Sequence, residues 1–151
     1  MNVAIWDLDN CLSADGWRLP LIRDPDVHPA QRFTEYHALC HHDAPRNLDV
    51  FQALSLEPVF ITGRPEAVRT ATRAWIRAWL GVEPHFLFMR ADDDHRRSVQ
   101  VKRDLVRQRL PRHLWNVMAA YDDHAGIVEM YRTELNIPAQ RLFIQDRNEH
   151  E

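Results

Sequence analysis

The chain lacks several features that define whole classes of protein. No stretch of its 151 residues approaches the roughly 20 consecutive apolar residues that a membrane-spanning helix needs. No basic segment followed by an apolar one marks the N-terminus as a secretory signal. Only two cysteines occur, Cys11 and Cys40, which does not suggest a disulfide framework and fits a reducing compartment. We therefore expect a cytoplasmic protein with no membrane partner.

An excess of positive charge is also lacking. The formal net charge is −3, so no global basic field draws the protein to nucleic acid or to an anionic membrane. Lysine is nearly absent, because Lys102 is the only one and the other permanently basic side chains are arginine. Because lysine occurs at this one position, we infer that Lys102 has a special role. The length favours one domain, which we place at residues 1–151.

What the chain does contain is an alternation of short apolar runs and amphipathic stretches, which is typical of α/β folds. We expect five strands, at residues 3–6, 58–62, 85–89, 115–121 and 141–145. We expect helices at residues 30–41, 48–54, 65–81, 98–110 and 127–135. Pro65 suits the first position of the third helix and Gly81 its C-terminal stop. Apolar spacing predicts the buried faces of two helices: Phe33, Tyr36, Leu39 and Cys40 in the first, and Val68, Thr72, Trp75, Ile76, Trp79 and Leu80 in the third.

Acidic or hydroxyl residues follow three of the predicted strands at their carboxyl ends. Asp7 and Asp9 follow the first strand, Thr62 ends the second, and Asp122 and Asp123 follow the fourth. In an open parallel sheet this edge is where ligands bind. Side chains that are far apart in the sequence would therefore meet there.

These residues provide the parts for phosphoryl transfer through an aspartyl-phosphate. Asp7 can attack phosphorus, and Asp9 can protonate the leaving oxygen and later deprotonate water. Thr62 can donate a hydrogen bond to the phosphate, helped by the amides of the helix that follows. Lys102 can bridge the nucleophile and the phosphate.

The same carboxylates can hold a metal. Asp7 and Asp9 together with Asp122 and Asp123 form an oxygen-rich set that suits Mg²⁺. A divalent cation offsets the repulsion between the nucleophile and the phosphate.

Each motif also has a purely structural interpretation. An Asp pair can form a turn at the end of a strand or cap a helix, and Thr62 can cap the helix after it. A lone lysine on a helix is usually solvated, and a lone arginine is usually on the surface. The ordered return of several motifs favours the chemical interpretation.

The four motifs resemble those of the haloacid dehalogenase (HAD) superfamily. They read Asp-Leu-Asp-Asn-Cys, then Ile-Thr-Gly-Arg, then a single Lys, then Tyr-Asp-Asp. The resemblance implies a three-layer Rossmann-like α/β domain with a central, mostly parallel five-stranded sheet. Receiver domains place their lysine after the last strand, whereas here it precedes the Asp-Asp pair. About fifty residues separate the first two motifs, which leaves room for a small cap domain or none.

The middle and last motifs resemble more narrowly the 3′-phosphatase domain of bacteriophage-type polynucleotide kinase. The similarity includes Thr-Gly-Arg-Pro-Glu, Phe-Leu-Phe-Met-Arg and Tyr-Asp-Asp-His-Ala-Gly-Ile-Val-Glu-Met-Tyr-Arg. Arg18 lies eleven residues after Asp7, where that family has an active-site arginine. The resemblance therefore implies that Gly63, Arg64 and Arg18 join Thr62 in binding the phosphate. No P-loop is present in the sequence, so the kinase half is absent from it.

Four positions depart from this family pattern. Asn10 and Cys11 replace the usual Gly-Thr, Ser98 replaces an acidic residue four before the lysine, and His124 replaces a cation. These changes bear on substrate choice more than on the core chemistry.

We expect a Mg²⁺-dependent phosphomonoesterase that removes the 3′-phosphate from nucleic-acid ends or from nucleotides. An open site with a small cap can accept the end of a polymer. One alternative keeps the chemistry but acts on a small nucleotide or sugar phosphate. Another is a catalytically weak module that binds phosphorylated ends. The sequence does not indicate an oligomeric state.

Overall fold

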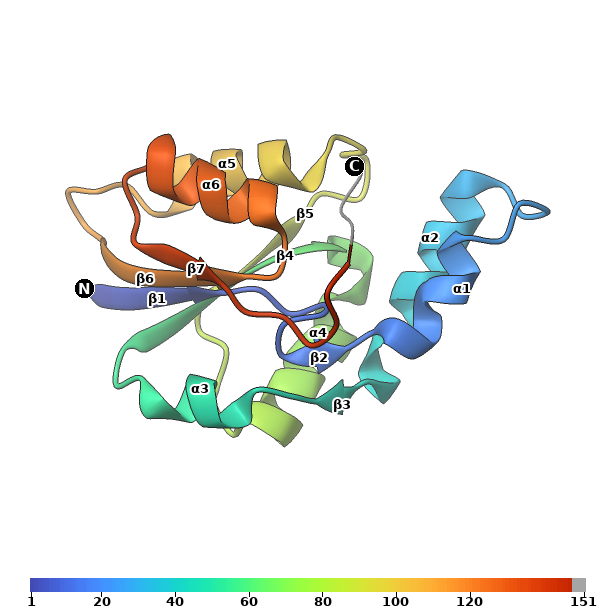
Figure 1. Cartoon of the computed structure of the whole chain (residues 1–151), viewed down its shortest axis with the longest axis horizontal. Helices are drawn as coiled ribbons and strands as arrows, with labels where there is room; N and C mark the ends of the chain where they lie inside the picture. The colour runs from blue at the N-terminus through green and yellow to red at the C-terminus, as the bar shows by residue number, and fades with distance from the viewer. Residues whose placement is uncertain (148–151) are drawn as a thin grey trace.

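A parallel sheet forms the centre of the computed structural model, which describes residues 1–147 (Figure 1). The last four residues of the expected domain, 148–151, lie outside the described residues. The strand order is β5-β4-β1-β6-β7, and every pair is parallel. The strands are β1 (Asn2–Trp6), β4 (Glu57–Pro65), β5 (Leu87–Arg90), β6 (Asn116–Asp122) and β7 (Ala139–Arg141). The predicted five-stranded α/β fold is confirmed.

Helices cover both faces of this sheet (Figure 1). On one face lie α5 (Ser98–Arg109) and α6 (Ala125–Thr133), and on the other α3 (Leu48–Ala53) and α4 (Arg69–Trp75). Successive side chains of a strand point to opposite faces. Trp6 therefore packs with Phe51 of α3, while Ile5 packs with Val106 and Tyr131 of the other helical layer. The apolar strands are buried on both faces, as expected of a parallel sheet.

The stretch from Pro65 to Gly81 differs in part from its prediction. Pro65 is the last residue of β4, and a 3₁₀ turn, η3 (Glu66–Val68), leads into α4. The final turn, η4 (Ile76–Leu80), is a π-helix that ends at Gly81 with φ 69°. A π-turn holds more residues than an α-turn, so the helical spacing shifts there. Trp79 was predicted to be buried, but its side chain points outward and is 51% exposed, so that prediction was wrong.

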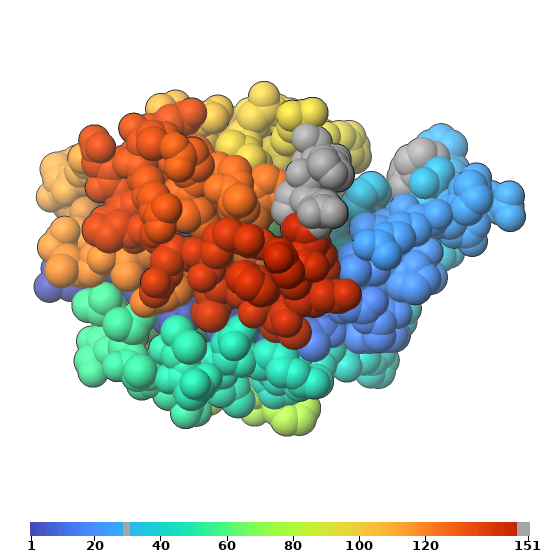
Figure 2. Space-filling view, viewed as in Figure 1, coloured from blue at the N-terminus to red at the C-terminus, as the bar shows by residue number. Residues whose placement is uncertain are grey.

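A small projection separates the first two motifs. It lies between two short strands, β2 (Ser13–Ala14) and β3 (Ala44–Pro45), whose antiparallel pairing the sequence analysis did not predict. The projection contains η1 (Gly16–Arg18), α1 (Leu19–Ile22), α2 (Pro29–Ala38) and η2 (Cys40–His42). Figures 1 and 2 show α1 and α2 standing out from the rest of the molecule. Tyr36 and Cys40 are buried as predicted, whereas Phe33 is 52% exposed. The cap is small rather than absent.

The last described segment runs back towards the first motif. The strand expected at residues 141–145 is instead β7, and the chain after it crosses close to β2 (Figure 1). The amide of Ile144 donates to the carbonyl of Asn10 at 2.9 Å. This segment therefore borders the predicted site. Among residues 1–147, the structure has no helix that combines the length and apolarity needed to cross a membrane.

Candidate active site

The predicted site residues meet at the carboxyl edge of the three central strands. β1 lies between β4 and β6, so Asp7, Thr62 and Asp122 end neighbouring strands. The amide of Asp7 continues the ladder by donating to the carbonyl of Tyr121 at 3.0 Å. All three side chains are buried. The topology thus brings together residues that are more than fifty positions apart.

Lys102 reaches this edge from α5. Its Nζ donates to Asp7 Oδ1 at 2.7 Å and to Asp122 Oδ2 at 2.6 Å. Burial by itself lowers the pKa of the ammonium, but the carboxylates of Asp122 and Asp7 raise it well above its usual range. The interpretation of the only lysine as a solvated surface charge was therefore wrong. A charged Lys102 therefore lies beside Asp7, the predicted nucleophile, at the edge where a phosphate is expected to bind.

Three carboxylates form the acidic part of the site. Asp7, Asp122 and Asp123 each offer an oxygen, and these oxygens lie within 4.8 Å of one another. Burial, followed by the neighbouring carboxylates, raises the pKa of both Asp7 and Asp123. Three carboxylates and the Lys102 ammonium together carry a formal charge of −2. The donor set and this charge fit one divalent, oxygen-preferring cation such as Mg²⁺.

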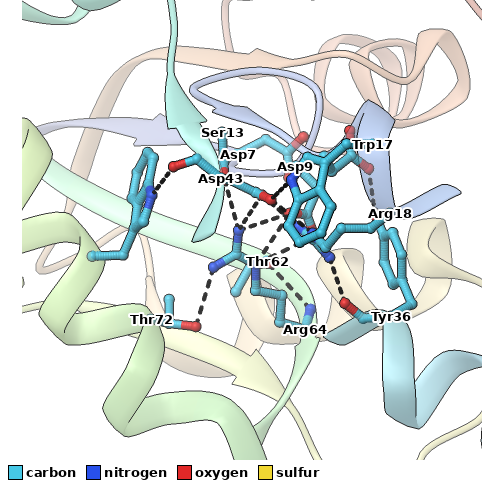
Figure 3. Close-up of polar contacts among 12 residues, drawn as sticks. Asp7, Asp9, Ser13, Trp17, Arg18, Tyr36, Asp43, Thr62, Arg64 and Thr72 are labelled. Atoms are coloured by element: carbon cyan, nitrogen blue, oxygen red, sulfur yellow. Dashed lines mark hydrogen bonds and ion pairs between the residues drawn. The ribbon is translucent and has the colours of Figure 1, made fainter. Parts of the chain in front are cut away.

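Asp9 is held by arginine rather than by the acidic group. Its Oδ1 accepts from Arg18 Nη2 at 2.8 Å and from Arg64 Nη2 at 2.7 Å (Figure 3). Burial favours the neutral acid, but Arg64 and Arg18 outweigh it and hold the pKa of Asp9 well below its usual range. The membership of Asp9 in a metal site stays a prediction.

Both arginines were weighed as surface residues, and that interpretation was wrong because their side chains are fully buried. The structure places Arg18 and Arg64 on the proposed acid, Asp9. That Arg18 and Arg64 also bind the phosphate remains a prediction.

Asp43 is a site residue that the sequence analysis missed. Its buried carboxylate accepts from Arg18 Nε at 2.8 Å and Nη2 at 2.5 Å, and from Ser13 Oγ at 2.5 Å. It also accepts from Trp17 Nε1 at 2.8 Å and lies 3.7 Å from Arg64 Nη2 (Figure 3). Two guanidinium groups and two carboxylates therefore balance in a buried cluster. Asp43 precedes β3 in a turn and shows no periodic signal that could have identified it.

The turn after Thr62 is shaped by side chains of β5 and α5. Thr62 Oγ1 accepts from the amide of Arg64 at 3.1 Å, which fixes the turn rather than capping a helix. The Gly63 carbonyl accepts from Arg90 Nε at 2.9 Å, and Arg90 Nη2 donates to Ser98 Oγ at 3.1 Å. A Cβ on Gly63 would lie only 3.2 Å from Ser98 Oγ. Ser98, where the resembled family has an acid, thus links this turn to α5 through Arg90.

Two further departures from the family pattern have structural roles. Asn10 adopts φ 58°, and its Nδ2 donates to Asp123 Oδ2 at 3.0 Å. An asparagine tolerates this left-handed geometry, so it can replace glycine. The Nδ1 atom of His124 accepts from the amides of Gly126 and Ile127 and caps α6. Asp122 and Asp123 are therefore not the cap of that helix.

His37 is another residue that the sequence analysis did not single out. It lies on α2, its ring 4.9 Å from that of Tyr36, and its buried Nδ1 has no hydrogen-bond partner in the described part of the chain. Burial lowers the pKa of His37 to about 4, with Asp9 and the arginines around it as the main charged neighbours. The projection thus places a neutral imidazole in the electrostatic surroundings of Asp9.

Comparisons with known proteins agree with this arrangement. A family model described as the polynucleotide kinase PNKP phosphatase domain matches residues 30–142. A protein of Autographa californica nuclear polyhedrosis virus, named as a candidate bifunctional polynucleotide kinase/RNA ligase, is 29% identical over 137 residues. That alignment covers 91% of this chain but 16% of the viral protein.

Two solved structures of the Pnkp1/Rnl/Hen1 RNA repair complex share the fold. Their TM-scores are 0.72 and 0.70 at 22% and 21% identity, and each match covers 93% of this chain. The matches cover 42% and 45% of the longer chains. The chain therefore spans less than half of each relative.

Proposed function

The chain belongs to the family of polynucleotide kinase PNKP phosphatase domains, and from this premise we propose that it removes the 3′-phosphate from nucleic-acid ends or nucleotides. One observation supports this proposal above all others. The Lys102 ammonium lies 2.7 Å from Asp7 Oδ1, beside two more carboxylates, so a cation and oxygen atoms that could hold a metal surround the proposed nucleophile. The carboxylate of Asp7 is thus surrounded by the groups that an aspartyl-phosphate requires.

The first step forms a covalent intermediate. An oxygen of Asp7 attacks phosphorus, the bond from phosphorus to the leaving oxygen breaks, and Asp9 gives that oxygen a proton. Lys102 neutralises charge on the phosphate oxygens, and the hydroxyl of Thr62, which accepts from the Arg64 amide, donates its own hydrogen to them. In the second step Asp9 takes a proton from the water that attacks the aspartyl-phosphate. Phosphate leaves, and both carboxyl groups return to their starting states.

The two arginines on Asp9 control its proton. With no phosphate bound, Arg18 and Arg64 keep Asp9 ionised. A bound phosphate competes for these guanidinium groups and adds negative charge beside Asp9, and both effects raise the pKa of Asp9 and favour the protonated acid, with the proton taken from solvent. We propose that the acid thus becomes competent only when substrate is present.

Asp7, Asp122 and Asp123 would hold the metal, with Asp9 as a further predicted ligand. A bound Mg²⁺ offsets the repulsion between the carboxylate nucleophile and the phosphate. We extend the proposal to a single domain spanning residues 1–151 that works in the cytoplasm. The free, buried thiols of Cys11 and Cys40 support a reducing compartment.

The experiment measures phosphate release from a 3′-phosphorylated oligonucleotide, with Mg²⁺ and with EDTA. We expect release with Mg²⁺ alone and at least a 10³-fold loss in Asp7→Asn, on the order of losses for other catalytic nucleophiles. Asp49→Asn, an exposed position on α3, is the matched control and should keep wild-type activity. An Asp7→Asn variant as active as wild type would rule out the mechanism.

The same assay separates the alternative functions. Faster turnover of mononucleotides or sugar phosphates than of oligonucleotides would favour a small-molecule phosphatase. The catalytically weak binding module is motivated by Asn10-Cys11, Ser98 and His124. Its signature is tight binding of phosphorylated ends without multiple turnover on any phosphomonoester.

A further inference from the structure

A cavity of about 620 Å³ adjoins the candidate active site and has no role in the chemistry above. It lies between the segment after β2, the start of β3 and the segment after β7. Its polar and aromatic lining includes Asn10, Asp15, Trp17, Arg46, Gln145 and Arg147. This volume is in the range of pockets that bind small organic ligands.

Trp17 is the most conspicuous residue of this lining. Its indole is fixed by the hydrogen bond from Nε1 to Asp43 Oδ1, yet the side chain is 51% exposed. Among the described residues, the Trp17 ring contacts one other ring, that of His42, edge-on at 6.4 Å between centroids. A rigid aromatic face open to solvent is the kind of surface on which nucleobases stack.

The polar groups of the cavity are arranged for a ligand with hydrogen-bonding edges. The Nη atoms of Arg147 bind Asp15 at 2.7 and 3.2 Å, but its buried Nε has no hydrogen-bond partner among residues 1–147. Within residues 1–147, the side-chain amide of Gln145 makes no hydrogen bond. Arg46 is exposed at the rim and bonds only the Pro45 carbonyl, so its charge is unpaired among the described residues. An amide and two arginines suit a base edge and a backbone phosphate.

The cavity is directly connected to the catalytic groups. Asn10 lines it and donates to Asp123 of the acidic group. Asp43 accepts from both Trp17 and Arg18, and Arg18 holds Asp9. From the cavity lining, one residue, Asn10, leads to the acidic group, and two, Asp43 and Arg18, connect Trp17 with the proposed acid, as Figure 3 shows for the second route.

We propose that this cavity binds the terminal nucleoside of a 3′-phosphorylated strand, with its base stacked on Trp17 and its next phosphate near Arg46. The inference rests on the proposed function and specifies its substrate as a strand end with a base. A sugar phosphate would fill the catalytic edge but leave this cavity empty.

The experiment compares Trp17→Ala, Trp17→Phe and wild type on two substrates. One is a 3′-phosphorylated oligonucleotide, and the other is p-nitrophenyl phosphate, which lacks a base and a strand. Loss of one stacked base weakens binding roughly 5- to 150-fold, equivalent to about 1–3 kcal/mol. We expect Trp17→Ala to lower kcat/KM for the oligonucleotide relative to p-nitrophenyl phosphate by such a factor, mainly through KM. Trp17→Phe should retain most of the preference because it keeps an aromatic face.

Trp79→Ala is the matched control, because Trp79 is also 51% exposed but lies on η4 outside the cavity. It should leave both activities at wild-type values. An unchanged substrate ratio in Trp17→Ala overturns the inference. An equal fall on both substrates that Trp17→Phe does not reverse also overturns it, because that pattern reports a disturbed Asp43.

Binding to the Asp7→Asn protein tests the cavity independently of turnover. Fluorescence anisotropy with a labelled 3′-phosphorylated oligonucleotide should show weaker binding when Trp17→Ala is added. Equal binding with and without Trp17→Ala would overturn the inference even for an active phosphatase. If no phosphomonoester is hydrolysed but Trp17 still governs binding, the proposed function fails and the nucleoside site stands.

Discussion

Replacing Asp43 by asparagine tests the buried charge cluster that holds the proposed acid. The carboxylate accepts two hydrogen bonds from Arg18, one from Ser13 and one from Trp17. Asparagine keeps the size of the side chain but has one acceptor oxygen and no charge. In Asp43→Asn the two buried guanidinium groups share the partly exposed Asp9 as their single carboxylate partner in the cluster, and an amide N–H faces donors.

The expected loss of stability follows from the burial of these groups. Removing one partner from a buried, hydrogen-bonded ion pair costs about 3–5 kcal/mol. For a chain of this length each kcal/mol lowers Tm by roughly 2–4 °C. Asp43→Asn should therefore lower Tm by about 6–20 °C in thermal unfolding followed by circular dichroism. Because Asp43 positions Arg18 on Asp9, phosphate release should also fall at temperatures where the variant is folded.

Glu83→Gln is the matched control for this variant. Glu83 also accepts from two arginines, Arg73 and Arg77, but all three side chains are at least 40% exposed. Exposed ion pairs contribute little because water and salt screen them, so Tm should barely change. Equal Tm values for Asp43→Asn and Glu83→Gln would refute the claim that burial makes the Asp43 cluster essential.

Two further predictions concern the metal and pH. Mg²⁺ at about 100 times its Kd should raise the free energy of unfolding by about 2.7 kcal/mol. Urea titrations with Mg²⁺ and with EDTA measure this increment, which should vanish in Asp122→Asn; an increment retained there would place the metal elsewhere. His37 has a folded-state pKa of about 4 against 6.5 for the unfolded chain, so the unfolded state binds more protons between these values. The free energy of unfolding should therefore fall by up to ~3 kcal/mol as pH drops from 6.5 to 4. Urea titrations at several pH values measure this decrease, which should be smaller in His37→Gln. An equal decrease in the variant would contradict the buried neutral imidazole.

The sheet and the meeting of the candidate site residues at its carboxyl edge were predictable because they depend on local patterns. Apolar runs end at Asp7, Thr62 and Asp122, and parallel strands bring such ends to one edge. The only lysine precedes the last strand, and its place on α5 follows from a twelve-residue amphipathic helix. Burial of Lys102 between two carboxylates then requires only that this helix pack against β4 beside α6. The meeting of Asp7, Thr62, Asp122 and Lys102 in one place could therefore be predicted from their positions in the sequence.

The residues that were missed or misjudged depend on packing between distant segments. Asp43 precedes a two-residue strand, and its four hydrogen bonds come from the segment at residues 13–18. Nothing in the local sequence distinguishes it from a surface turn residue. Trp79 was misjudged because the π-turn at Ile76–Leu80 alters the spacing that a sequence pattern assumes. The exposure of Trp17 likewise follows from the geometry of the projection.

The projection between β2 and β3 therefore does more than border the catalytic edge. It supplies Trp17, Arg18 and Tyr36, and Tyr36 accepts from Arg18 Nη1 through its carbonyl at 2.9 Å while its ring lies 4.2 Å from the guanidinium. Arg18 is thus fixed by the projection on one side and by Asp43 on the other. The same Asp43 carboxylate accepts from both Trp17 and Arg18, so a change at Trp17 also bears on the position of Arg18 beside Asp9. We therefore expect substitutions at Trp17 and Asp43 to be non-additive in a double-mutant cycle of kcat/KM for the oligonucleotide.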